Sequence, residues 1–240
     1  RRRMHKLESQ IYKSKLQTTS EEFKKNKESM LGMLEEIDTL LDEAEAGGGP
    51  DHQKRLAARG KLPVRERIFN FLDPDSPFLE ISGLAGYKSD YPVGGGAVAG
   101  IGVCSGIECI IFANDPTVLA GAMHYYSVKK WMRSMAIARD CRIPFIQFVE
   151  SAGGDLRPRG AMSAGAMGHF AESGRQFYEI TELSKLNIPT VTVTFGTATA
   201  GGAYQPGMSD YNIFVKDQAD VALAGPPLVQ MATGEISSRE

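Results

Sequence analysis

The regular alternation of apolar strand segments with helical segments constrains the fold of this chain more than any other feature. Three runs rich in β-branched and aromatic residues, IECIIFA, PFIQFVE and PTVTVTF, are typical of buried strands. Stretches of helical length separate them, at about residues 127–139 and 169–186. Because strands that alternate with such helices form βα units, the sequence predicts an α/β fold.

Shorter elements are predicted on both sides of this alternating region. The segment GGGAVAGIGVCSG predicts a strand before IECIIFA, and Ser105-Gly106 between the two suits a hairpin turn. Residues 65–72 predict a short helix, and the turn-forming residues 73–77 follow it. Beyond PTVTVTF, the segments YNIFV and ADVALA predict two further short strands.

The N-terminal part of the chain predicts an amphipathic helix. Thr19-Ser20-Glu21-Glu22 has the pattern of a capping box, and the sequence GGGP ends the helix at about Ala46. We expect residues 1–50 to form a basic lead-in and this helix, and residues 51–240 to form the main domain. The helix has an apolar stripe, which must be buried on its own domain or on another subunit. The stripe consists of Phe23, Met30, Leu34, Ile37, Leu41 and Ala44.

Charge and cysteine content narrow the classes of partner. With 27 basic and 29 acidic residues the formal net charge is -2, which gives no reason to expect a nucleic-acid or membrane partner. No apolar run approaches the roughly 20 residues of a membrane-spanning helix. Cys104, Cys109 and Cys141 form no CxxC pair, so we expect reduced, buried thiols and no bound metal.

The first residues, RRRMHKLESQIYKSK, are basic and poor in acids. They are typical either of the remnant of an organellar targeting segment or of a solvated basic lead-in. The localisation that we expect is therefore the mitochondrial matrix or a bacterial cytoplasm.

Two loops of small residues follow successive strands. The first, FVESAGGDLRPRG, contains Gly153-Gly154, and the second, TFGTATAGGAYQPG, contains Gly201-Gly202-Ala203. In an open α/β sheet, loops at the ends of such strands come together at one site. Loops with almost no side chains offer backbone N–H groups, and two that converge on a carbonyl oxygen form an oxyanion hole. The alternative is that the glycines serve only turns and close packing.

A conventional catalytic group is harder to find. His124 and His169 fall in predicted helices without a partner motif, so a surface or core histidine is the better interpretation of both. Ser151 is not part of a GxSxG elbow. Glu150 and Asp155 flank the first loop. Each is a candidate base, and the alternative is that each serves only capping and turn formation. No nucleotide-binding GxGxxG or GxxxxGK[ST] motif is present. The pattern favours chemistry that stabilises negative charge, with the proton acceptor supplied from elsewhere.

The chain resembles the carboxyltransferase (β) subunit of biotin-dependent acyl-CoA carboxylases. The resemblance runs from about Thr19 to the end, in the family's order and spacing, and most closely fits the methylcrotonyl-CoA branch, with the propionyl and longer-chain branches as alternatives. It implies a crotonase-like fold, a β-β-α spiral with an N-terminal helical extension. The segments that carry it are RGKLPVRERIFNFLDPDSPFLE, GGGAVAGIG, IIFAND, ESAGGDL, TATAGGAYQPGMSD and AGPPLVQMATGE.

The resemblance also implies a mechanism and partners. A carboxyl group carried on biotin by a biotin carboxylase or carboxyl-carrier subunit is transferred to an acyl-CoA enolate, and the carboxyltransferase is a homo-oligomer, a hexamer in the family. Arg59 and Lys61 match positions suited to the CoA phosphates; the alternative is a solvated basic helix face that also includes Arg65. The implied oxyanion residues are Gly201 and Gly202 with Gly153 and Gly154 facing them, and Ala203 and Tyr204 are implied to bind substrate.

Departures from the family leave alternatives open. The chain stops after MATGEISSRE, where family members continue into a biotin-binding domain, so we expect an N-terminal, CoA-binding half. The loop ESAGGDLRPRG differs from the family's DSGGA-type text, and the small residues 161–168 fit an altered pocket or a lid, so the acyl group stays open. A crotonase-type hydratase or isomerase and a non-catalytic CoA-binding scaffold remain alternatives. Under the oxyanion hypothesis, Gly202→Val is expected to abolish activity and spare the fold, because Cβ would block the carbonyl.

Overall fold

The computed structural model describes residues 13–155 and 170–237, with side chains in the last segment from residue 174 onward. By its internal contacts the chain divides into two units, residues 1–39 and 40–240. The first unit contains most of helix α1 (Glu21–Ala46), which begins and ends where the sequence predicts. The Ser20 hydroxyl accepts a hydrogen bond from the N–H of Phe23 at 3.2 Å, so the predicted N-cap is present. No side chain of α1 is buried.

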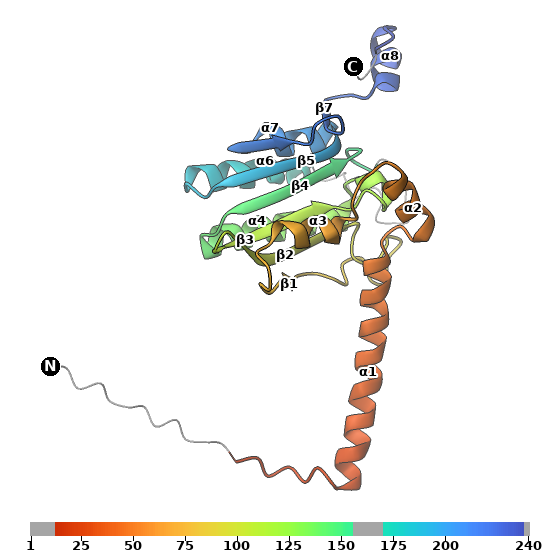
Figure 1. The fold of residues 1–240 in the computed structure, drawn as a ribbon, viewed down its shortest axis with the longest axis vertical. Coiled ribbons are helices and arrows are strands. Elements are labelled where there is room, and N and C mark those ends of the chain that lie inside the picture. The colour runs from red at the N-terminus through yellow and green to blue at the C-terminus, as the bar shows by residue number, and fades with distance from the viewer. Residues whose placement is uncertain (1–12, 156–169, 238–240) are drawn as a thin grey trace, which may run out of the picture. The chain divides into compact units, whose positions relative to one another are not determined.

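The second unit is built on one seven-stranded sheet in the order β1-β2-β3-β4-β5-β6, with β7 paired to β5 (Figure 1). The first three strands are antiparallel, and the pairings from β3 onward are parallel. The strands are β1 (Leu79–Glu80), β2 (Ala97–Cys104), β3 (Ile107–Asn114), β4 (Phe145–Ser151), β5 (Thr190–Thr199), β6 (Tyr211–Phe214) and β7 (Asp220–Ala222).

The predicted hairpin between β2 and β3 is confirmed. Ser105 and Gly106 both have left-handed backbones, with φ of 53° and 74°, as a two-residue hairpin turn requires. The Asp73 carboxylate accepts hydrogen bonds from their N–H groups at 2.6 and 2.7 Å. The predicted turn at residues 73–77 therefore stabilises the hairpin.

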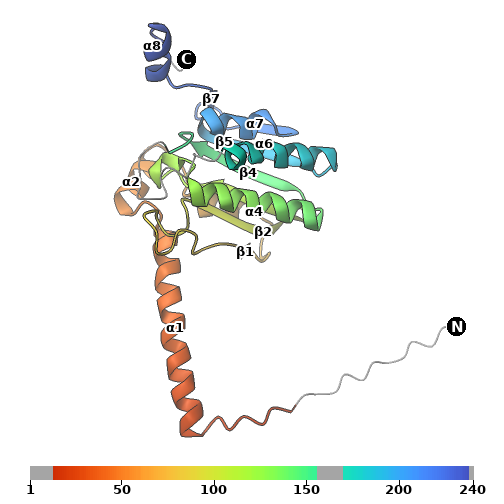
Figure 2. The ribbon, with the colours of Figure 1, turned by 180° about the vertical axis from the view of Figure 1, so that it is seen from behind.

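Helices cover both faces of the sheet. Helices α4 (Tyr125–Cys141) and α6 (Phe170–Lys185) lie on one face, as Figure 2 shows, and α3 (Val64–Phe71) lies on the other (Figure 1). Alternate residues of β2 and β3 enter the two cores, because successive side chains of a strand point to opposite faces. In β3, for example, Phe112 belongs to the α4–α6 core and Ile111 to the α3 core.

Several details differ from the sequence-based expectations. Helix α2 (Pro50–Ala58) was not predicted; it begins just after the glycine break with Pro50 in its first turn, where proline is favoured. Strand β5 extends to Thr199, so part of the predicted second loop is strand. His124 is the residue before α4 and not within it. The remaining short elements are the 3-10 helices Leu119–Gly121 and Ala200–Ala203 and the helices α7 (Tyr204–Gly207) and α8 (Pro226–Thr233).

Two further expectations concern the burial of the cysteines and helices that could span a membrane. Cys109 is buried and Cys104 is half-buried, but Cys141 is exposed at the end of α4, so the prediction of buried thiols is wrong for Cys141. All three are free thiols. In the part of the chain that the structure describes, no helix is both long and apolar enough to span a bilayer. His169 and the small residues 161–168 lie outside the described residues.

Candidate functional site

The two glycine loops lie side by side because the strands before them are neighbours. β4 and β5 run parallel, and Ser151 at the end of β4 pairs with Ala198. A Cβ atom added to Gly153 would lie 2.9 Å from the carbonyl oxygen of Thr199. A Cβ atom on Gly202 would lie 3.1 Å from the Cβ of Ser151. Each loop thus contacts the other through a glycine at which a side chain would be crowded.

A bulge in β5 precedes the second loop. Val149 pairs with Thr194 and Ser151 pairs with Ala198, so the single residue Glu150 of β4 faces residues 195–197 of β5. Bulged residues leave the regular ladder, and their backbone groups need other partners. Beyond the bulge, Ala198 pairs with Ser151 of β4 and residues 197–199 pair with β7, so β5 continues beyond the predicted PTVTVTF segment.

A buried group of charges lies at the bulge. The Lys61 ammonium is 2.5 Å from Glu150 Oε1, and the Arg67 guanidinium is 2.9 Å from Glu150 Oε2. Lys61 also donates a hydrogen bond to the carbonyl oxygen of Phe195 at 3.0 Å, and the Arg67 guanidinium lies 4.7 Å from the centre of the Phe195 ring. We call Lys61, Arg67, Glu150 and Phe195 the Glu150 cluster. Both oxygens of Glu150, one of the candidate bases, are engaged by cations.

A cleft of about 410 Å³ opens beside the two loops. Arg59, the exposed residue that ends α2, lines this cleft, whereas Lys61 is turned toward Glu150. Ala120 lines it from a turn in which residues 119–121 all have positive φ, a conformation that costs a non-glycine residue about 1 kcal/mol. The lining residues are Arg59, Pro116, Ala120, Glu150, Ser151, Ala152, Thr197, Thr199, Gly225, Pro227 and Leu228.

The glycines of the first loop differ in how their N–H groups are used. The N–H of Gly153 donates to the Ser151 hydroxyl at 3.2 Å. Met123 forms a parallel bridge to Gly154. In this bridge the N–H of Met123 donates to the carbonyl oxygen of Gly153, and the N–H of Asp155 donates to the carbonyl oxygen of Met123. This bridge does not use the N–H of Gly154. Gly153 is buried and Gly154 is half-exposed, so Gly154 is the glycine of this loop that a ligand can approach.

The glycines of the second loop differ in the same way. Gly202 is buried against Ser151, while a Cβ atom on Gly201 would meet nothing within 4 Å. Gly201 is the second residue of the 3-10 helix Ala200–Ala203, and N–H groups at a helix start have no acceptor within the helix. The backbone of Gly202 does not have positive φ.

Two other residues implied in substrate binding, Ala203 and Tyr204, do not line the cleft. Ala203 is buried, and Tyr204 is 43% exposed with its ring edge-to-face on Phe177 of α6. The four glycines are also absent from the cleft lining; Gly153-Gly154 directly follow Ala152, and Gly201-Gly202 begin two residues after Thr199, and both Ala152 and Thr199 do line it. Their roles in binding and catalysis therefore remain predictions.

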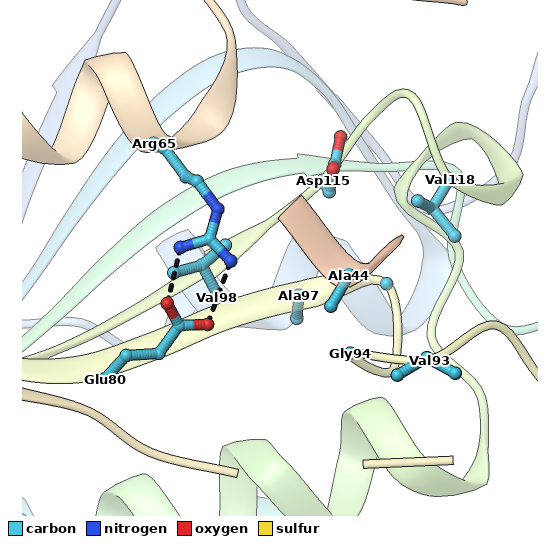
Figure 3. A pocket seen from close by; sticks show the side chains of 10 residues that line it. Ala44, Arg65, Glu80, Val93, Gly94, Ala97, Val98, Asp115 and Val118 are labelled. Carbon is cyan, nitrogen blue, oxygen red and sulfur yellow. Dashed lines mark hydrogen bonds and ion pairs between the residues drawn. The ribbon is translucent and has the colours of Figure 1, made fainter. Parts of the chain in front are cut away.

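Arg65 belongs to a second, smaller cavity (Figure 3). This cavity has a volume of about 10 Å³, which is room for a single water molecule. Arg65 of α3 reaches Glu80 of β1 through two hydrogen bonds, as Figure 3 shows, one of them at 3.0 Å. Although burial alone would lower the pKa of Arg65, the hydrogen bond and charge of Glu80 raise it. The alternative of one solvated basic helix face is wrong, because Arg59, Lys61 and Arg65 lie on different elements and have different surroundings.

Sequence reasoning missed a buried lysine, whereas its interpretation of His124 as a surface or core histidine is confirmed. Lys130 of α4 is 2% exposed and donates hydrogen bonds to the carbonyl oxygens of Gly94 and Ala97 at 3.2 and 2.6 Å. Burial lowers its pKa to about 8. His124 is 1% exposed and its ring stacks on Tyr91 at 4.5 Å, so it is a core histidine. Among the described residues, no group of three or more His, Cys, Asp or Glu side chains is arranged to hold a metal ion.

Comparison with known proteins identifies related chains. Residues 55–240 match the carboxyl transferase domain family. A probable biotin-dependent acyl-coenzyme A carboxylase beta2 subunit of Mycobacterium tuberculosis is 48% identical over 212 residues, which cover 88% of this chain and 39% of that protein. A probable mitochondrial methylcrotonoyl-CoA carboxylase beta chain of Drosophila melanogaster is 41% identical over 242 residues, which cover 100% of this chain and 41% of that protein.

Solved structures share the fold. The geranyl-CoA carboxylase beta subunit of P. aeruginosa matches with a TM-score of 0.78 and 39% identity, over 95% of this chain and 41% of that one. Transcarboxylase 12S, a hexamer solved with hydrolysed methylmalonyl-coenzyme A bound, matches with a TM-score of 0.75 and 26% identity, over 88% of this chain and 40% of that one. The predicted crotonase-like α/β fold is therefore confirmed. The chain spans about two fifths of the length of these relatives.

Proposed function

The chain belongs to the carboxyl transferase domain family, and from this premise we propose that it is the acyl-CoA-binding part of a biotin-dependent acyl-CoA carboxyltransferase. The enzyme would transfer a carboxyl group from biotin, carried by a partner subunit, to the enolate of an acyl-CoA. The observation that carries the proposal is the contact between two loops of small residues beside a cleft that also holds Arg59. Because the chain spans about two fifths of its relatives, the activity of the whole protein is part of the proposal.

We propose Gly154 and Gly201 as the donors that stabilise the enolate oxygen. Gly154 is half-exposed and a Cβ atom on Gly201 would meet nothing within 4 Å, whereas the N–H of Gly153 already bonds to Ser151 and Gly202 is packed on Ser151. Gly153 and Gly202 then serve the same reaction as the close-packed frame that holds the two donors. Backbone donors in fixed positions stabilise developing negative charge without reorganisation, which is the largest single contribution in many enzymes.

The surroundings of the cleft fit a reaction whose base comes from another group. Glu150 is the only carboxylate among the described residues that line the cleft, and both of its oxygens are engaged by Lys61 and Arg67. Carboxybiotin, when carried in by the partner, supplies the carboxyl group and then the nitrogen base. The part left to this chain is to bind the thioester, orient it and stabilise the enolate charge.

Arg59 is proposed to bind a phosphate of CoA. Its guanidinium is exposed in the cleft, and arginine binds phosphate through two parallel hydrogen bonds. Tyr204 and Ala203 lie on the helix start after Gly202, beside the path of the acyl chain in this proposal. Lys61, the second cation that the resemblance implies, is already paired with Glu150.

The substrate and partners are proposed from the relatives. The methylcrotonoyl-CoA carboxylase similarity favours a methylcrotonyl-type acyl group, with propionyl and longer acyl groups as the alternatives. The partner would be a biotin carboxylase and biotin carboxyl-carrier subunit, and the hexameric transcarboxylase 12S supports a hexamer of this chain. One relative is bacterial and another is mitochondrial, and on this basis the mitochondrial matrix or a bacterial cytoplasm is the compartment that we propose.

The test is carboxylation of a panel of acyl-CoAs, from acetyl through methylcrotonyl to long-chain, by the full-length chain with its biotin-carrying partner. We expect biotin-dependent carboxylation of one acyl class. If no acyl-CoA were carboxylated, the proposal would be rejected, and conversion of a substrate without biotin would favour the hydratase or isomerase alternative. Selective binding of acyl-CoA without any turnover would favour the scaffold alternative.

Two substitutions, one at Arg59 directly after α2 and one at Arg55 within α2, test the assignment of the phosphate site. Arg59→Ala is expected to raise KM for the acyl-CoA about 10-fold or more, because a charged hydrogen bond to phosphate is lost, and to leave kcat almost unchanged. Arg55→Ala is the matched control, since Arg55 is exposed on the same helix and does not line the cleft. Equal KM values for the two variants would exclude Arg59 as a CoA contact.

A further inference from the structure

The bulge in β5 sets how far the second glycine loop extends relative to the first. Between the pairs Val149–Thr194 and Ser151–Ala198, β5 has two more residues than β4. If the ladder continued regularly from Val149–Thr194, the residue facing Ser151 would be Gly196, and the loop at Ala200–Ala203 would begin farther beyond Ser151. The register of the two loops therefore depends on a local irregularity of the sheet and not on the regular ladder.

Every charged member of the Glu150 cluster contacts this bulge. Lys61 donates to the carbonyl oxygen of Phe195, and the guanidinium of Arg67 lies over the ring of the same residue. A Cβ atom on Gly196 would lie 2.6 Å from the carboxylate carbon of Glu150, so the absence of a side chain at Gly196 makes room for that carboxylate. Backbone groups that leave a ladder are costly when buried and unbonded, and Lys61 supplies the donor that Phe195 needs.

The cluster also holds the segment that ends at Arg59. The backbone N–H of Lys61 donates a hydrogen bond to the carbonyl oxygen of Leu56 in α2 at 3.3 Å. The side chain of Lys61 donates to the carboxylate of Glu150 in β4. Lys61 thereby ties the short connection after α2 to the helix through its backbone and to the sheet through its side chain. Arg59 lies two residues before this attachment point, at the rim of the cleft.

We infer that the Glu150 cluster is a positioning device that sets the register of the two glycine loops and the place of Arg59. This inference rests on the proposed function, because it assigns the loops to a reaction. Lys61 and Glu150 act through the backbone of β5 and do not touch the reacting atoms. Stability alone does not require the cluster, since buried ion pairs replaced by well-packed apolar groups are often no less stable.

The first test compares two buried carboxylates in the full-length chain assayed with its biotin-carrying partner. Glu150→Gln removes the charge that holds Lys61 and Arg67. We expect kcat to fall about 100-fold, because a displacement of a reacting group by about 1 Å has an effect of this size. KM for acyl-CoA is expected to stay within about 3-fold of the value for the unsubstituted protein. Glu179→Gln is the matched control, because Glu179 is also a buried carboxylate between two cations, Arg139 and Arg175, on α4 and α6. Its kcat is expected to stay within about 3-fold of the original.

The second test separates a positioning role of Lys61 from phosphate binding. Lys61→Met leaves Glu150 its contact with Arg67, so this milder variant also serves if Glu150→Gln does not fold. A thioester of the same acyl group on pantetheine has none of the phosphates of CoA. If Lys61 positions the loops, its substitution lowers kcat about equally for both substrates. A loss seen with acyl-CoA and absent with the pantetheine thioester would assign Lys61 to phosphate and overturn the inference.

The third test does not depend on the reaction. Hydrogen exchange is measured on the same full-length proteins, at the amides of residues 151–155 and 199–204. We expect exchange at both loops to accelerate about 10-fold or more in Glu150→Gln and Lys61→Met, and not in Glu179→Gln, because the bulge loses its partners. If the unsubstituted protein were inactive on every acyl-CoA, the proposed function would be rejected, but the hydrogen-exchange result would still test the positioning role. Unchanged exchange at both loops in the two cluster variants would overturn the positioning inference whatever the activity.

Discussion

Two buried carboxylates of this chain have the same partners in kind and different surroundings. Glu150 lies between Lys61 and Arg67, whose side chains are 12% and 3% exposed. Glu179 lies between Arg139 and Arg175, whose side chains are 33% and 62% exposed. The first group is enclosed by the ends of β4 and β5, and the second joins helices α4 and α6 at the surface.

From this difference we expect the burial of the cations, more than that of the carboxylate, to decide how strongly each group depends on its counterion. Arg139 and Arg175, which pair with Glu179, keep part of their hydration, so we expect them to tolerate the loss of its negative charge. Lys61 and Arg67 have almost none, and a buried charge without a counterion is costly. The Glu150 cluster therefore holds its geometry strictly, which suits a place beside a site, whereas the Glu179 group ties two helices together.

The largest effect that we predict is on the free energy of unfolding. Glu150→Gln is expected to lower it by about 3–5 kcal/mol, because two buried cations lose their counterion, and Glu179→Gln by about 1–2 kcal/mol. Urea denaturation of both variants and the original chain measures the two losses. Equal losses would show that the exposure of the cations does not matter and would remove the basis of the comparison.

Lys130 extends the comparison to a buried cation that has only carbonyl partners. Its pKa is lowered from 10.5 to about 8, by burial first and by the charge of Arg65, with Glu80 acting in the opposite sense. Between pH 8 and 10.5 the unfolded chain therefore binds more protons at this residue, so the free energy of unfolding rises with pH, by about 3 kcal/mol.

The control for this pH dependence is Lys130→Met. The other titrating groups are common to both proteins, so the difference between their stability curves isolates Lys130. Chemical denaturation at pH 8 and at pH 10.5 gives the two slopes. Parallel curves would mean that Lys130 stays protonated in the fold across this range.

Substitution of two glycines compares the same two regions without changing a charge. Gly196→Ala places a methyl group 2.6 Å from the carboxylate carbon of Glu150, and we expect a loss of about 1–3 kcal/mol. Gly174→Ala, in α6, meets nothing within 4 Å and is expected to stabilise the chain by about 0.5–1 kcal/mol. Thermal unfolding of the two variants checks the opposite signs, and stabilisation by Gly196→Ala would show that the cluster yields easily.

The smallest effect is predicted for an ion pair of the same kind at the surface. Lys24 lies 2.6 Å from Glu21 in α1, with side chains 61% and 89% exposed. Lys24→Ala is expected to change the free energy of unfolding by less than about 0.5 kcal/mol, because water solvates both charges. A loss above 1 kcal/mol in urea denaturation would contradict the ranking by exposure.

The expected effect of Gly202→Val changes with the structure. The sequence suggested that a Cβ atom there would block a carbonyl oxygen, but this atom points at Ser151, at 3.1 Å. The substitution therefore tests the packing of the two loops, and Gly201 is the position whose Cβ enters open space. The proximity of the loops was predictable, while the direction of each Cα–H bond was not.

Local patterns in the sequence determined most of the elements. The Ser20 cap, the Ser105-Gly106 turn and the helices near 127–139 and 169–186 depend on neighbouring residues, so they could be read from the chain itself. The order of the strands and helices and the family's motifs then determined the fold class and the family. The meeting of the two glycine loops followed from the same order, because parallel neighbours end at one edge.

Only the tertiary structure decided which residues of the predicted site are available. Lys61 and Glu150 are 89 residues apart in sequence, so nothing near Lys61 indicates that its charge is already paired. The β5 bulge exists only relative to β4, and the different use of Gly153 and Gly154 depends on Ser151 and Met123. Residue types and spacings determine which groups a chain offers, but the partner of each charge and each N–H is decided by long-range packing, which the sequence encodes without displaying.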